Sequence, residues 1–214
     1  MAIPSIFTRL AEPLQDFVVA EGIQEQPGSN IHNAVRDILY EIGEDPDRQG
    51  LLKTPDRVRR MFAELTAGYH TDPVELINGA LFDVEYNDLV LVKDIEFYSL
   101  CEHHMLPFYG RAHVAYLPDG KVIGLSKIPR VVEMFARRLQ VQERMTSEIA
   151  RLLDEVLKPQ GVAVVVEGSH MCSMMRGVKK AEATMTTRTL LGEFQEDREL
   201  RAELFAHIAK DSSK

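Results

Sequence analysis

The hydrophobic pattern of this chain of 214 residues changes character after Asp83. Before that point, apolar residues recur at helical spacing over 31–42, and Thr54 followed by Pro55 predicts the N-cap and first residue of a second helix. After it, segments rich in β-branched and aromatic residues predict strands over 88–100, 111–117 and 121–124. A helical front third therefore precedes a sheet.

The second half of the chain continues to alternate between helices and strands. Ser126 can cap a helix whose apolar face spans 128–139, and a further helix has its apolar face over 145–156. The remaining expected elements are a buried strand, a Thr-rich strand that can pair with it and a closing amphipathic helix, over 161–168, 183–191 and 196–210. This order predicts an α+β domain whose antiparallel sheet carries its helices on one face.

The length of the chain favours one compact domain with an extension. Residues 1–26 show no sustained period, and we interpret them as a variable N-terminal arm without an assigned function. Residues 27–80 form the predicted N-terminal helical region, and residues 81–214 form the predicted main domain.

The charge balance limits the partners of this protein. Lys and Arg number 25 and Asp and Glu number 33, which leaves a formal net charge of −8. Such an acidic surface argues against nucleic acid or anionic lipid as the main partner, so an anionic ligand has to meet a local basic patch. The longest aliphatic run, 162–166, is far shorter than the roughly 20 apolar residues of a membrane-spanning helix. Charges at Arg9, Glu12 and Asp16 leave no apolar signal-peptide core, and we expect a cytoplasmic protein without a membrane partner.

Both cysteines of the chain lie beside histidines, each directly after a predicted strand. Cys101 and His104 are three residues apart, so a turn places thiolate and imidazole on the same side, and Cys172 can supply a third ligand. Three protein ligands leave one position of a tetrahedral zinc ion for water, which is the arrangement of catalytic sites. The alternative is that both cysteines are small core residues, because free cysteine is often buried.

Two further histidines neighbour these positions. His103 is next to a proposed ligand but points a different way, while His170 and Cys172, two residues apart in extended chain, face the same side. Each histidine can transfer protons beside a metal site. The alternative for each is a hydrogen-bonded surface or core group.

Basic residues gather in the same part of the sequence. Ser126, Lys127 and Arg130 open one predicted helix, where free amides, the helix dipole and the cations all favour phosphate. Arg176 follows Cys172 in a second basic segment, and an ordinary solvated face is the alternative interpretation of both. Glu143 opens the next helix, where it favours the dipole, and if buried it can accept two N–H bonds from a guanine edge.

Four motifs, in order and correctly spaced, resemble those of GTP cyclohydrolase I: Cys101-Glu102-His103-His104, Gly124-Leu125-Ser126-Lys127, Gln140-Val141-Gln142-Glu143-Arg144 and His170-Met171-Cys172. The resemblance extends over about residues 30 to 208. It implies a tunnelling fold for 81–214, in which subunits assemble their sheets into a barrel, and a homodecamer of two pentameric rings. It also implies one zinc ion (Zn²⁺) per active site, with Cys101, His104 and Cys172 as ligands.

The same resemblance implies a reaction. The imidazole ring of GTP is opened at C8, formate is released, and the skeleton recloses to 7,8-dihydroneopterin triphosphate, the first step of tetrahydrofolate and pterin biosynthesis. His103 and His170 then carry protons, and Glu143 holds the guanine edge. The other substrate-binding residues that the resemblance implies are Gln142, Ser126, Lys127, Arg130, Arg176 and Arg57.

Two alternatives remain open at this point. One is another enzyme of the same fold, such as a pterin synthase or a nitrile reductase, although these use different catalytic groups. The other is a non-catalytic, zinc-stapled oligomerisation module that binds nucleotide or an unidentified regulatory protein. This module requires a closed four-ligand metal site, with His103 or His170 as the fourth ligand.

Overall fold

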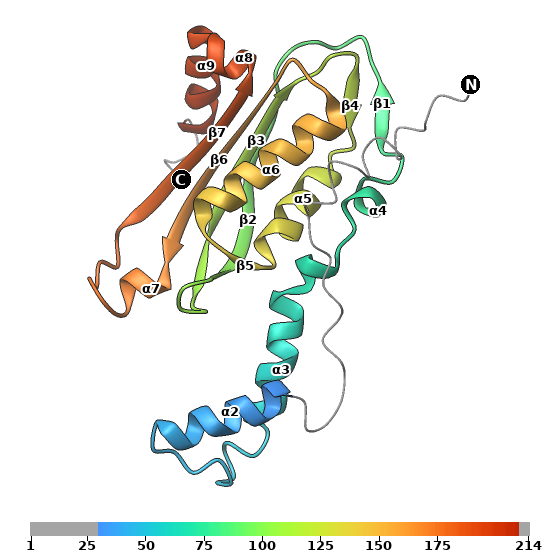
Figure 1. The fold of residues 1–214 in the computed structure, drawn as a ribbon. Coiled ribbons are helices and arrows are strands. Elements are labelled where there is room, and N and C mark those ends of the chain that lie inside the picture. Colours follow the sequence, from blue (N-terminus) through green and yellow to red (C-terminus); the bar gives the residue numbers. More distant parts are fainter. Residues whose placement is uncertain (1–29, 210–214) are drawn as a thin grey trace.

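The structure is a computed structural model that describes residues 30–209. The predicted arm 1–26 therefore lies outside the described residues. Helices α2 (Asn30–Glu41) and α3 (Thr54–Leu65) pack against each other and project from the rest of the chain (Figure 1). Both helices were predicted, but Lys53 is the N-cap residue of α3 and no side chain caps the helix, so the expected cap at Thr54 is displaced by one residue.

Short elements connect these helices to the sheet. They are η2 (Ala67–His70), α4 (Pro73–Ile77) and β1 (Leu81–Asp83). Asp72 caps α4, because its carboxylate accepts hydrogen bonds from the backbone N–H groups of Val74 and Glu75. Strand β1 pairs antiparallel with β4 (Lys121–Ile123) in a separate two-stranded sheet.

The main sheet has five strands in the order β5-β2-β3-β6-β7. Four of them form an antiparallel sheet, as predicted: β2 (Val90–Cys101), β3 (Pro107–Leu117), β6 (Gly161–His170) and β7 (Thr184–Gly192). The short strand β5 (Leu139–Gln140) was not predicted and pairs with the end of β2 in parallel. The C-terminal ends of β2 and β6 lie at the same end of this sheet, because Leu100 pairs with Pro107 and Phe108 pairs with His170.

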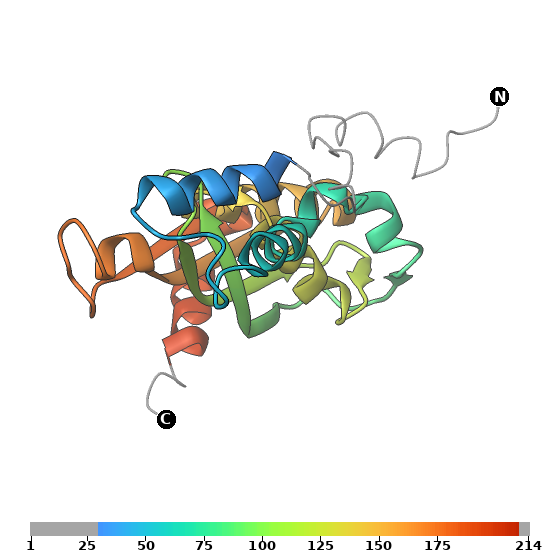
Figure 2. The same cartoon turned by 90° about the horizontal axis from the view of Figure 1, so that it is seen from below.

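Helices cover both faces of the sheet. The predicted helices α5 (Lys127–Ala136) and α6 (Gln142–Leu157) pack on one face (Figure 1). Helix α9 (Arg198–Ala209) follows α8 (Glu193–Glu196) and packs on the other face, where Leu204 meets Ala115 and Ala163 (Figure 2). The expectation that all helices lie on one face is therefore wrong for α9. The physical reason is that β6 buries apolar side chains on both of its faces.

None of the helices among residues 30–209 is both long and apolar enough to cross a bilayer.

A β-bulge interrupts the pairing of β2 with β3. The register shifts between Val92 and Ile95, and Asp94 has a positive φ of 57°. The Nδ1 atom of His113, whose side chain is 3% exposed, accepts a hydrogen bond of 3.2 Å from the Asp94 backbone N–H. A neutral imidazole thus holds the bulge, since protonation of Nδ1 would remove this acceptor.

We expect acidification from about pH 7.5 to about pH 5.5 to destabilise the fold through His113. Burial lowers the pKa of its imidazole, an effect that Asp94 and Glu167 oppose and that Arg111 and Lys93 reinforce. The unfolded chain then binds the proton more readily, so the stability present above the unfolded pKa of about 6.5 is lost as the pH falls below it. The thermal midpoint of His113→Asn, which keeps an acceptor that does not titrate, should fall less. An equal fall of the thermal midpoint in the wild-type protein and in His113→Asn would contradict this interpretation.

Candidate metal centre and active site

The turn from β2 to β3 places Cys101 and His104 on the same side. The Cys101 N–H donates to the Leu106 carbonyl at 2.9 Å, and the N–H groups of His104 and Met105 donate to the Cys101 carbonyl at 3.3 and 2.8 Å. Met105 adopts a positive φ of 52°, which lets the chain reverse within a few residues. The three-residue spacing in the sequence therefore corresponds to a compact, hydrogen-bonded turn.

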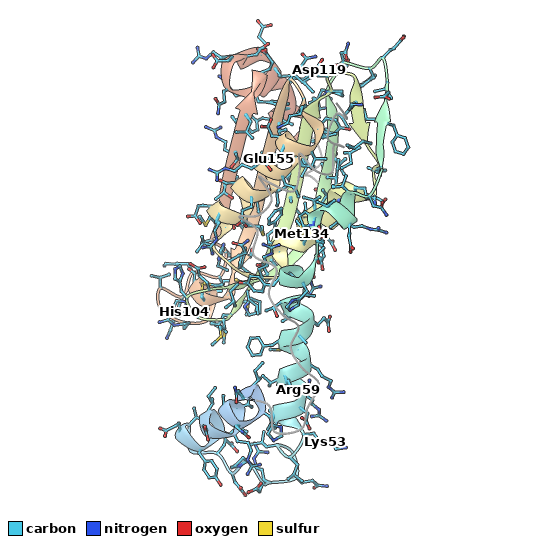
Figure 3. All side chains as sticks on the ribbon, turned by 45° about the vertical axis from the view of Figure 1, so that its right-hand side comes forward. Lys53, Arg59, His104, Asp119, Met134 and Glu155 are labelled. Atoms are coloured by element: carbon cyan, nitrogen blue, oxygen red, sulfur yellow. The ribbon has the colours of Figure 1, made fainter. Side chains whose placement is uncertain are left out.

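Cys172 approaches this turn from the end of β6, the strand that pairs with β3. It lies in α7 (Met171–Met174), which begins directly after β6. One ligand atom from each of Cys101, His104 and Cys172 lies within 4.8 Å of the other two. Cys101 is buried, Cys172 is half-buried and His104 is exposed at this end of the sheet, beside α7 (Figure 3). We call these three residues the Cys-His-Cys group.

The donor atoms of the Cys-His-Cys group fit a zinc ion. Thiolate sulfur and imidazole nitrogen are the ligands that zinc prefers in proteins. Burial raises the pKa of the Cys172 thiol, and so does the neighbouring Cys101, first through a side-chain hydrogen bond and then because two adjacent thiolates repel each other. A divalent cation removes this repulsion, since it compensates both negative charges. The group can therefore hold a metal ion.

The two other histidines of the motifs border the Cys-His-Cys group in different environments. The side chain of His103 is 65% exposed, with Nδ1 at 3.7 Å from Cys101 Sγ. The ring of His170 stacks on Phe108, with ring centroids 4.7 Å apart and planes at 1°. Burial lowers the pKa of His170, while the Glu143 carboxylate opposes this shift. Burial thus favours the neutral imidazole of His170, and the stacking on Phe108 fixes the plane of its ring.

The first turn of α6 brings Gln142 and Glu143 to the same place. Glu143 is exposed in this chain, so the buried setting considered for a guanine-binding carboxylate is not formed by the described residues alone. Gln142 is 1% exposed, and its side-chain oxygen lies 2.9 Å from His170 Nε2. The side-chain amide of Gln142 already forms hydrogen bonds within the chain. Its role in substrate binding stays a prediction.

A polar network that the motifs did not reveal ties the metal-binding turn to α6. Arg144 forms an ion pair with Glu102 and donates from Nε to the Gln140 side chain at 3.0 Å. The Glu102 N–H in turn donates to the Gln140 carbonyl at 3.1 Å. The guanidinium of Arg144 lowers the pKa of Glu102. All three residues stand within the quoted motifs, but no sequence spacing indicates that they contact one another.

Of the predicted phosphate-binding residues, Arg176 lies beside the Cys-His-Cys group. Its Nη1 atom is 2.8 Å from His104 Nε2. Lys127 instead donates to the Leu76 carbonyl of α4 at 2.7 Å, and Arg130 lines a cavity of about 580 Å³ between α5 and the segment from η2 to α4. Ser126 precedes Lys127 at the start of α5, and Arg57 lies on the projecting helix α3 (Figure 1). The described chain therefore does not gather these four residues around the Cys-His-Cys group.

Comparison with known proteins identifies the family. The family described as GTP cyclohydrolase I matches residues 31–209. The chain belongs to the GTP cyclohydrolase I family. The resemblance seen in the motifs is thereby confirmed, and every residue of the Cys-His-Cys group lies within the matched part.

Relatives named GTP cyclohydrolase 1 match most of the chain. The protein from Campylobacter curvus is 57% identical over 179 residues, which are 84% of this chain and 94% of the relative. The protein from Leptospira biflexa is 56% identical over 182 residues, 85% of this chain and all of the relative. The protein from Chlorobaculum tepidum is 55% identical over 184 residues, 86% of this chain and 82% of the relative.

One solved structure, the apo form of the archaeosine synthase QueF-Like, covers 49% of this chain and 93% of its own at 17% identity. Its TM-score of 0.42 is too low to support a conclusion about this member of the GTP cyclohydrolase I family.

Proposed function

We propose that this chain is a zinc-dependent GTP cyclohydrolase I. The enzyme opens the imidazole ring of GTP at C8, releases formate and recloses the skeleton to 7,8-dihydroneopterin triphosphate, the first step of tetrahydrofolate and pterin biosynthesis. The observation that supports this function is the convergence of Cys101, His104 and Cys172 beside two histidines, in a chain of this family. That set of groups disfavours the pterin synthase and nitrile reductase alternatives, which use different catalytic groups.

The Cys-His-Cys group would hold the zinc ion. When bound, zinc supplies a Lewis acid that lowers the pKa of a water molecule toward about 7. The protein's part is to fix three ligands and leave access from solvent, which the exposure of His104 provides.

The two neighbouring histidines move protons during ring opening. Burial favours the neutral form of His170, which can accept a proton and return it to a purine nitrogen. His103 is exposed and adjacent to Cys101, so it can exchange protons with solvent as the ring opens and formate leaves.

Substrate recognition uses the acidic and basic residues of the motifs. Glu143 accepts two N–H bonds from the guanine edge, with Gln142 next to it. At the triphosphate site, cationic side chains provide the local positive charge that an anionic substrate needs in a chain of acidic net charge. They are Lys127, Arg130, Arg176 and Arg57, with the hydroxyl of Ser126.

The phosphate ligands that lie away from the Cys-His-Cys group come from neighbouring subunits, in a homodecamer of two pentameric rings. Among residues 30–209, strand β7 is an edge of the sheet, and β2 is paired on its outer side only at Leu100 and Cys101. Such free strand edges pair readily with another copy, as the barrel of a tunnelling fold requires. Large apolar side chains are also exposed on or beside α2 and α3, namely Ile38, Tyr40, Ile42 and Met61.

The proposed domain organisation is an arm over 1–26, a helical region over 27–80 and a catalytic domain over 81–214. The protein would act in the cytoplasm without nucleic acid or membrane partners, which its net charge of −8 supports.

Incubation of the purified protein with GTP should yield formate together with a pterin that becomes fluorescent after oxidation. We expect Cys101→Ala and Cys172→Ala to lose both products because they lose the metal, and His170→Ala to keep the metal but lose ring opening. Ser173→Ala, directly after Cys172 in the sequence, is the matched control and should stay active. Normal pterin formation by protein stripped of zinc and shown to remain metal-free would contradict the proposed function.

Removal of one predicted phosphate-binding side chain should distinguish the contribution of the triphosphate to binding from that of the base. A charge-assisted hydrogen bond contributes roughly 1.5–3 kcal/mol, so Arg176→Ala should weaken GTP binding by about 10- to 150-fold and guanosine binding far less. Lys180→Ala, an exposed cation of the same segment, is the control and should change neither. Equal weakening of GTP and guanosine by Arg176→Ala, measured by calorimetry, would show that Arg176 does not contact the phosphates.

A further inference from the structure

The orientation of the Gln142 side-chain amide is fixed by its surroundings. Its Nε2 atom lies 3.0 Å from the Val166 carbonyl oxygen and 2.9 Å from the Met185 carbonyl oxygen. Both of these groups only accept hydrogen bonds, so the atom that faces them has to be the amide nitrogen. A flipped amide would place its oxygen against two carbonyl oxygens. The Gln142 Oε1 atom therefore faces His170.

This orientation selects one tautomer of His170. The Oε1 atom of Gln142 is an acceptor only and lies 2.9 Å from His170 Nε2, so Nε2 has to carry the hydrogen. In a neutral imidazole the other ring nitrogen, Nδ1, then keeps its lone pair. No described residue forms a hydrogen bond with Nδ1. This is the nitrogen that remains available to a substrate.

The surroundings of Gln142 leave little freedom for a different arrangement. Thr146 Oγ1 donates to the Gln142 carbonyl at 2.7 Å and contacts Thr187 Oγ1, which lies 3.1 Å from Gln142 Nε2. Gly168 provides the space for the amide, because a Cβ atom there would lie only 2.3 Å from Gln142 Oε1. Side chains from α6 and β7 and a glycine of β6 thus hold one amide in place.

We propose that Gln142 is a positioning residue that fixes His170 in the Nε2–H tautomer, so that Nδ1 is the atom that takes up a proton from water and then, in the imidazolium, delivers this proton to a purine nitrogen, while Nε2–H stays bonded to Gln142. The catalytic consequence rests on the proposed function, whereas the tautomer itself does not. This role differs from direct substrate binding, because Gln142 is buried and its amide already has partners within the chain.

The tautomer can be measured on the full-length, zinc-containing protein by ¹⁵N NMR of labelled histidine rings. The His170 signals are assigned by their loss in His170→Asn. We expect a protonated Nε2 and an unprotonated Nδ1 in the neutral ring, and a mixture of tautomers in Gln142→Met. Gly168→Ala keeps the Gln142 side chain but places a Cβ atom against its Oε1 atom, so it should shift the tautomer as well. A His170 ring protonated at Nδ1, or a tautomer unchanged in both variants, would overturn the proposal.

Steady-state kinetics separate positioning from binding. In Gln142→Met and Gly168→Ala we expect kcat to fall on the order of 10- to 100-fold, within the contribution of a positioned acid-base group, with KM for GTP changed less than about threefold. Gln195→Met makes the same substitution at an exposed glutamine and should leave both constants unchanged. A raised KM with unchanged kcat would show that Gln142 binds substrate directly. A wild-type protein that releases no formate from GTP would refute the proposed function, and the NMR measurement would still decide the tautomer.

Discussion

The register of β3 against β2 and β6 determines where the chemistry of this protein lies. The C-terminal ends of β2 and β6 lie at one end of the sheet, because Leu100 pairs with Pro107 and Phe108 pairs with His170. Because side chains alternate between faces, a slip of one residue would turn His170 away from Phe108 and from α6. The candidate metal centre and the histidine proposed as its proton carrier are thus built on paired strands and one tight turn, which are rigid elements.

The site is complete for one part of the proposed reaction and incomplete for another. A single chain brings the ligand atoms of the Cys-His-Cys group together, and it also forms the hydrogen bond between His170 and Gln142 and the stacking of His170 on Phe108. The predicted phosphate ligands are divided, since Arg176 lies at the metal centre while Lys127 contacts α4. The strand edges that stay unpaired among residues 30–209 and the separated cations would both be explained by the proposed assembly, in which the pockets lie between subunits.

The sequence predicted local features well and contacts between distant residues poorly. The spacing of Cys101 and His104 was informative because a single turn determines their relation. The contact of Gln142 with His170 joins positions 28 apart and leaves no periodic or charge signal. Helical spacing located α9, but an amphipathic pattern does not tell which face of a sheet it covers. The two-residue strand β5 is too short for any pattern to predict.

X-ray absorption at the zinc edge of the purified protein tests the central claim most directly, because it reads the ligands of the ion itself. The account predicts two sulfur ligands at about 2.3 Å and one imidazole nitrogen at about 2.0–2.1 Å, and loss of the bound zinc in Cys172→Ala. A zinc site with a single sulfur or none in the wild-type protein would contradict it.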